Sequence, residues 1–101
     1  MVFIYTTCRK MKEAEDLSKL IIDKKLWVIV DFWPTKVSYK WDGSTVVTEH
    51  VMIMISTFEN KLEYLSSLIS EKHNYSVPMI AGVDVRRINL DYKEWMTREI
   101  S

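Results

Sequence analysis

The feature that most constrains the fold is a long segment with strand character, residues 27–57, that one tight turn divides into two arms. The turn contains Asp42 and Gly43, and an Asp-Gly pair readily adopts the positive φ angles that a two-residue hairpin turn requires. The first arm has 15 residues, where an average strand has about five or six. The sequence therefore predicts two unusually long antiparallel strands joined at Asp42-Gly43-Ser44.

Read at the two-residue period of a strand, both arms are apolar on both sides over the part away from the turn, whereas residues 36–41 alternate between apolar and polar as a half-exposed strand does. In the second arm Val51, Ile53 and Ile55 face one way, and Met52 and Met54 face the other. The first arm repeats the pattern with two opposed sets, Val28, Val30 and Phe32 against Trp27, Ile29 and Trp33. A strand that is apolar on both sides needs cover on both faces of its sheet.

Pro34 interrupts the first arm. Proline cannot donate to a strand ladder, so it indicates an edge strand, a bulge or a bend. We expect a kink near Trp33-Pro34, after which the strand continues from Lys36 to Trp41.

The rest of the chain alternates between strand-like and helix-like patterns. Runs rich in β-branched and aromatic residues predict strands, and apolar residues at helical spacing predict helices. The predicted strands are 2–7 and 79–85, and the predicted helices are 10–24, 58–72 and 90–98. Gly82 stands inside the last strand, and a glycine there indicates a bulge or a close backbone approach.

Hydroxyl side chains stand near the start of both main helices. Thr6 or Thr7 is expected to cap the first helix. Ser56 and Glu59 fit a capping box for the second helix, with Thr57 as the alternative cap.

The predicted order is βαββαβ followed by a short C-terminal helix, which is the α+β ferredoxin-like arrangement in a single domain of residues 1–101. Both main helices then pack on one face of the sheet. The other face is also apolar, and no helix is left to cover it unless the short C-terminal helix does part of this. An uncovered face of that kind exceeds the apolar patch that monomeric proteins usually expose. We therefore expect another subunit to cover it.

Composition excludes several classes of function. Fourteen basic side chains balance fourteen acidic ones, so no charge excess attracts nucleic acid or an anionic membrane. An RNA-binding domain of the same βαββαβ order needs aromatic residues on the third strand, which 51–55 lacks. The longest apolar run, five residues, is too short to cross a bilayer.

The sequence also has a single cysteine, no signal-peptide pattern and no catalytic motif. Together they indicate a cytoplasmic protein that is not an enzyme.

Several motifs, in order and spacing, match a known family. They are Tyr5-Thr6-Thr7, Glu13-Ala14, Ser38-Tyr39-Lys40-Trp41-Asp42-Gly43, Thr57, the run from His73 to Ile80, and the run from Asn89 to Trp95. On these motifs the chain resembles the CutA divalent-cation-tolerance proteins over essentially its full length. The resemblance implies a ferredoxin-like subunit in a tight homotrimer, similar in architecture to PII signalling trimers. It also implies tolerance to divalent metals, with copper the metal most often named.

The sequence departs from that family pattern at three positions. Ile29 replaces a common cysteine in the first arm, and Met79 replaces a common glutamate after the proline of the last strand. Asp31 stands where asparagine is usual. Thiolate ligation in the first arm is therefore lost, whereas imidazole and carboxylate ligands remain.

Three side chains are the candidate metal ligands: His73, Tyr75 and Asp31. Neutral imidazole binds divalent metals, although a histidine near a helix C-terminus is also favoured by the helix dipole. Asp31 lies on an apolar strand and needs a metal, an ion pair or a hydrogen bond across a subunit contact. No cofactor is required by the sequence, and copper or another divalent metal is the ligand to test.

For two other groups of residues, metal binding is one of two interpretations. His50, Met52 and Met54 share one side of the second arm, where they form either a soft copper(I) site or ordinary packing. Cys8 is either a small buried apolar residue or a metal-binding or redox-sensing thiol.

Two functions follow from the residues and the resemblance. The first is a non-enzymatic homotrimer that handles divalent metal. The alternative is a PII-like signalling or scaffold trimer that holds a small ligand or a partner protein in the clefts between subunits.

Overall fold

The computed structural model describes residues 1–24, 29–73 and 78–99. Its elements follow the predicted βαββαβ order and end in a third helix. In chain order they are β1 (Val2–Cys8), α1 (Met11–Asp23), β2 (Ile29–Trp41), β3 (Ser44–Thr57), α2 (Glu59–Lys72), β4 (Ala81–Asp84) and α3 (Leu90–Glu99). The ferredoxin-like fold class predicted from the sequence is confirmed.

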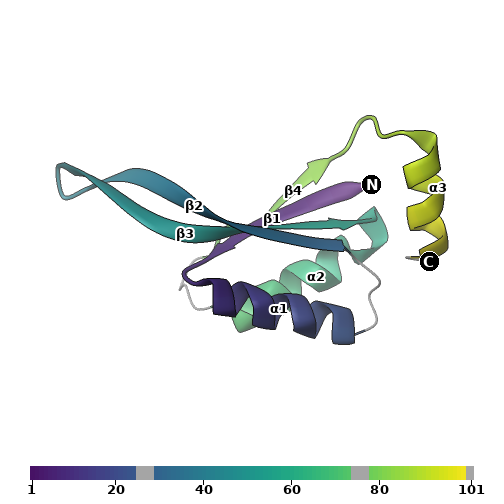
Figure 1. Ribbon diagram of the computed structural model, residues 1–101, viewed down its shortest axis with the longest axis horizontal. Helices are drawn as coiled ribbons and strands as arrows, with labels where there is room; N and C mark the ends of the chain where they lie inside the picture. The colour runs from purple at the N-terminus through teal and green to yellow at the C-terminus, as the bar shows by residue number, and fades with distance from the viewer. Residues whose placement is uncertain (25–28, 74–77, 100–101) are drawn as a thin grey trace.

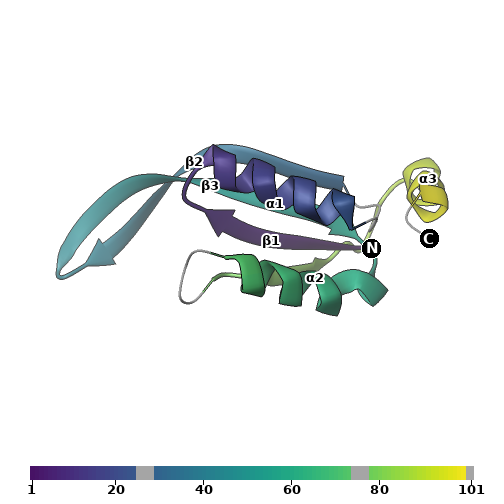
Figure 2. The same ribbon diagram turned by 90° about the horizontal axis from the view of Figure 1, so that it is seen from below.

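The four strands form one antiparallel sheet in the order β2-β3-β1-β4 (Figure 1). Helices α1 and α2 lie side by side against one face of it (Figure 2). The β2–β3 hairpin projects beyond the body of the subunit and accounts for its longest dimension, 49 Å.

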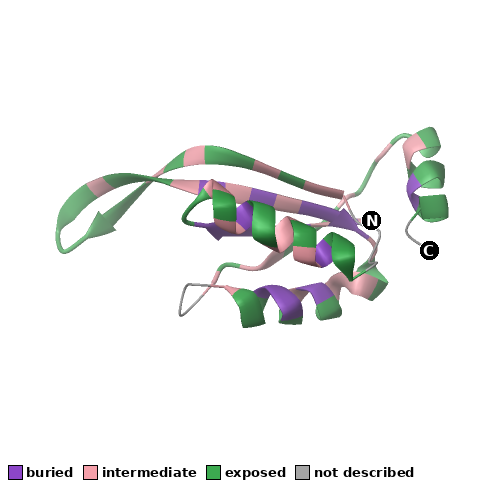
Figure 3. Ribbon diagram, turned by 60° about the horizontal axis from the view of Figure 1, so that its bottom comes forward, coloured by how far each residue is buried: buried purple, intermediate pink, exposed green. Residues whose placement is uncertain are grey.

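The hydrophobic core lies between the sheet and these two helices. Alternate residues of β1 and β3, including Ile4, Ile53 and Ile55, are completely buried against α1 and α2. The helices contribute Ala14, Ile21, Leu65, Leu68 and Ile69. Full burial of each large aliphatic side chain contributes roughly 1.5–3 kcal/mol. Figure 3 shows this burial on the strands next to the helices, whereas the far part of the hairpin is largely exposed.

The hairpin turn has the predicted geometry. Asp42 and Gly43 have φ angles of 50° and 80°, and Trp41 pairs with Ser44 on either side of them. Two consecutive positive φ angles match the right-handed twist of the strands, so the turn fits two long arms without splaying them.

The kink predicted at Pro34 does not interrupt strand pairing. Pro34 pairs with Val51, and the register runs without a bulge from Ile29 to Trp41. Strand β2 lies at the edge of the sheet, so the edge position, one of the three alternatives predicted for Pro34, is confirmed. At an edge, a nitrogen that points away from the neighbouring strand needs no N–H, so proline is tolerated there.

The hydroxyl caps predicted for both helices are wrong. Helices α1 and α2 follow Lys10 and Phe58, and neither of these residues makes a side-chain capping hydrogen bond. The candidate caps belong to the strands, where Thr6 and Thr57 are completely buried. Strand pairing outweighed the local capping signal.

The last strand is shorter than predicted, because β1 pairs with it only from Val2 to Tyr5. Neither alternative predicted at Gly82 is present, because Gly82 pairs with Ile4 in a regular register without a bulge, and its close neighbour is a side chain rather than a backbone. A Cβ atom at that position would lie 3.3 Å from Cδ1 of Leu62 on α2.

The sheet face opposite α1 and α2 is called the open face here. The strand registers place on it Phe3 and Tyr5 of β1, Asp31 and Trp33 of β2, His50, Met52 and Met54 of β3, and Val83 of β4. Helix α3 lies beyond the end of the sheet and does not cover this face (Figures 1 and 2). Trp33 and Val83 are 39% and 46% exposed. The apolar second face predicted from the sequence is therefore present, and none of the described helices covers it.

Candidate functional site

His73 lies at the junction between α2 and β1. It follows the last residue of α2, is half-buried, and its Nε2 is hydrogen-bonded to the backbone carbonyl oxygen of Thr7. Because a carbonyl oxygen can only accept, Nε2 is the donor in this bond. Metal-ligating histidines usually donate their second ring N–H to an oxygen in this way. The orientation of His73 is therefore compatible with metal ligation.

Asp31 lies in a different part of the sheet. Its carboxylate is exposed on the open face, in a row with Met54 and Tyr5 on the neighbouring strands. No described residue forms an ion pair with it. Strand β3 separates it from β1, so Asp31 and the β1 end that holds His73 are at least about 10 Å apart across the sheet.

The third predicted ligand, Tyr75, lies outside the described residues. Among the residues that are described, no three His, Cys, Asp or Glu side chains lie close enough to share a metal ion. The described part of one subunit therefore contains no complete site of hard and borderline ligands.

Cys8 lies next to Thr7 and belongs to the hydrophobic core. Burial, and then the nearby Glu13 carboxylate, raise the pKa of its thiol from 9.0 to about 11. Since the thiolate is the form that ligates metal, a thiol with this pKa is a poor ligand at neutral pH. This favours the interpretation of Cys8 as a small buried apolar residue.

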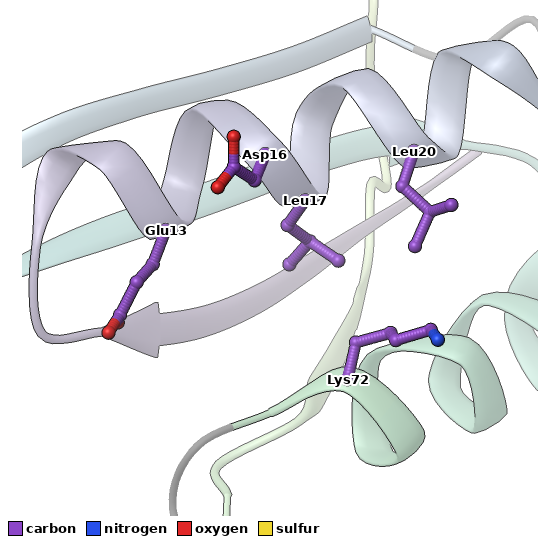
Figure 4. Close-up of a pocket in the computed structure, with 5 residues that line it drawn as sticks. All are labelled: Glu13, Asp16, Leu17, Leu20 and Lys72. Atoms are coloured by element: carbon purple, nitrogen blue, oxygen red, sulfur yellow. The ribbon is translucent and has the colours of Figure 1, made fainter.

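A groove of about 260 Å³ runs between α1 and α2 (Figure 4). Leu17 and Leu20 form its apolar part, Glu13 and Asp16 stand on α1, and Lys72 lines it from α2. The Lys72 ammonium lies 3.8 Å from the carboxylate of its neighbour Glu71. Charges of both signs line the groove.

The contact that sequence reasoning missed is the one between His73 and Thr7. The two residues are 66 positions apart, and the acceptor is a backbone carbonyl that every residue type carries. No side-chain pattern in the sequence signals such a partner.

Comparison with known proteins gives a consistent result over the whole chain. Residues 2–99 match the family described as CutA1 divalent ion tolerance protein. The divalent-cation tolerance protein CutA of Thermococcus kodakarensis is 31% identical over 97 residues, covering 96% of this chain and 93% of that protein.

Solved structures show the same fold. The crystal structure of CutA1 from Pyrococcus horikoshii has a TM-score of 0.86 and 29% identity, with 100% of this chain and 99% of that chain covered. The structure described as the periplasmic divalent cation tolerance protein CutA from Archaeoglobus fulgidus has a TM-score of 0.87 at 24% identity, and both chains are covered completely. The second likeness shows the fold alone.

None of the helices in the described part of the chain combines the length and the apolar character that a bilayer span requires.

Proposed function

The chain belongs to the CutA1 divalent ion tolerance family, and from this premise we propose that it acts as a non-enzymatic homotrimer that binds a divalent metal ion, with copper as the first candidate. The open face is the observation that carries this proposal. It is an apolar sheet surface that the subunit's own helices leave uncovered, and it carries an exposed carboxylate.

The apolar part of the open face supports self-association. Phe3, Trp33, Met52, Met54 and Val83 share this surface. The stripe continues along the hairpin through Val37 and Tyr39 to Trp41, which is 71% exposed. Burial of this surface against other copies removes apolar area from water at about 25 cal/mol per Å². Further copies of the same chain cover this apolar surface, so no other protein is required to bury it.

The position of Asp31 supports a metal site shared between copies. A carboxylate buried by a neighbouring subunit needs a cation or a hydrogen-bond donor. Since the described residues of one chain hold no ligand cluster, the proposed site draws Asp31 from one copy and His73 from another. Carboxylate and imidazole suit Cu(II) and Zn(II), and neither ligand requires the cysteine that Ile29 replaces.

Native mass spectrometry and calorimetric titration with Cu(II) and Zn(II) test both halves of the proposal. The expected results are a trimer mass and binding that Asp31→Asn and His73→Ala each weaken. Asp16→Asn is the matched control, because that carboxylate pairs with Lys12 on the exposed side of α1, 3.1 Å away. If the parent protein and all three variants bind the metal with equal affinity, Asp31 and His73 are not its ligands.

The native mass spectrum also tests the alternative function, a PII-like trimer that binds a small ligand or a partner protein. A bound organic mass on the trimer, with no metal, would support a small-ligand function instead.

The proposed compartment is the cytoplasm, as expected from the single cysteine. Cell fractionation with an antibody against the chain tests it, and recovery of the protein outside the cytoplasm would contradict it.

A further inference from the structure

A second type of metal ligand lies on the open face, apart from His73 and Asp31. His50, Met52 and Met54 alternate along β3 with the core residues Val51, Ile53 and Ile55. The three side chains therefore point away from α1 and α2, and all three are half-buried. Neither methionine belongs to the hydrophobic core between the sheet and the two helices.

The spacing allows His50 and Met52 to share one ion. Residues i and i+2 of a strand stand on the same face about 7 Å apart. The unbranched methionine side chain has three rotatable bonds, which allow its sulfur to lean toward the imidazole. Met54 stands a further 7 Å along β3, beyond the reach of an ion held between the first two.

An indole lies beside this pair. Trp33 of β2 is directly opposite Met52 in the register, and Thr35 is opposite His50. Side chains directly opposite one another have Cβ atoms about 5 Å apart, so the ring of Trp33 is close enough to lie against a cation at Met52. The face of an indole attracts a cation electrostatically.

The chemistry of the ligand atoms determines which metal ion the site prefers. Thioether sulfur is a soft ligand that selects Cu(I) over the harder divalent ions, and imidazole suits copper as well. We propose that His50 and Met52 form a Cu(I) site on the open face, with the Trp33 indole covering the bound ion. This site concerns the monovalent ion and uses neither Asp31 nor His73, so it goes beyond the function proposed above.

The test is anaerobic titration of the full-length protein with Cu(I) held by a competing chromophoric chelator. All proteins carry Cys8→Ala, so that the thiol does not compete for the ion. The expected result is one Cu(I) per chain. Loss of an outer-shell partner costs metal sites about 10–100-fold in affinity, so His50→Ala and Met52→Leu, which remove direct ligands, should each cost at least that. Trp33→Leu should cost about two- to fivefold.

Two methionine variants are the matched controls. Met54→Leu changes the next thioether on the same strand, and Met79→Leu changes a thioether that is 44% exposed outside the sheet. Both should bind Cu(I) as the parent protein does. X-ray absorption of the parent should show a sulfur neighbour of copper that only Met52→Leu removes.

The outcomes separate this site from the divalent one. Unchanged Cu(I) affinity in His50→Ala and Met52→Leu, or no binding against the chelator, would overturn the proposal. The oligomer mass of each variant is measured first, and His50→Gln replaces His50→Ala if the assembly changes. Loss of Cu(II) binding in Asp31→Asn with intact Cu(I) binding would separate the two sites, because each would respond to its own substitution.

Discussion

The imidazole of His73 is hydrogen-bonded through Nε2 to the carbonyl oxygen of Thr7, and this contact joins the end of α2 to the end of β1. The bond orients the ring and satisfies a backbone acceptor in a part-buried position. The same histidine therefore has a structural role that is separable from the metal binding proposed for it.

His73→Ala should lower the free energy of unfolding by about 0.5–1.5 kcal/mol, because the variant loses this bond and leaves the Thr7 carbonyl without its side-chain donor. Urea unfolding without metal measures the change. Lys72→Ala is the control, since it alters an exposed neighbour and should stay within about 0.5 kcal/mol. Equal stability of His73→Ala and the parent would mean that the bond contributes nothing.

The raised pKa of Cys8 predicts a loss of stability in alkaline solution. The fold holds the thiol proton more tightly than the unfolded chain does, so the contribution is complete below pH 9.0 and disappears as the pH rises through about 11. The loss should be on the order of 1–2 kcal/mol. Denaturant unfolding between pH 8 and pH 11 measures it, against Cys8→Ala, which removes this titration. Parallel pH profiles for the two proteins would contradict the prediction.

Gly43→Ala should destabilise the hairpin by backbone strain alone. The φ angle of Gly43 is +80°, and no atom lies within 4 Å of the added Cβ, so no clash contributes. A left-handed conformation costs an L-residue about 1–2 kcal/mol, and asparagine adopts it more readily. The expected order of stability in thermal or urea unfolding is glycine, then asparagine, then alanine. An alanine variant as stable as the parent would show that the turn had changed its conformation.

Trp33→Asp should break the proposed trimer. It places a charge at an apolar position of the open face, where another copy would have to desolvate it. Ser38→Asp is the matched control, because it adds the same charge on the opposite face of the same strand. Sedimentation velocity at micromolar concentration should give monomer for Trp33→Asp and trimer for Ser38→Asp. A trimer that survives Trp33→Asp would place the interface elsewhere.

Much of the fold was predictable because its signals are local. Asp42-Gly43 sets the turn, and the two-residue period from Val51 to Ile55 separates a core face from a second apolar face. Helical spacing located α1 and α2 within one residue at either end. The candidate site was less predictable, since the residues that surround each ligand come from strands and helices distant in the chain.

The wrong helix caps and the unbroken strand pairing at Pro34 share one physical cause. Ser56 and Thr57 carry a capping signal, yet β3 continues through both of them because they pair with Phe3 and Val2. Pro34 signals an interruption, yet the ladder passes through it because β2 has no neighbour on its outer side. In each case a long-range pairing determined what the local residues do.

The sequence by itself determined the elements, the hairpin turn and the presence of apolar residues on both faces of the strands, because side-chain periodicity and turn chemistry act between near neighbours. Only the tertiary structure decided the strand order, the bond between His73 and Thr7, and the separation of Asp31 from His73. These depend on which distant segments lie side by side, and that arrangement is set by burial of the whole core rather than by any local pattern.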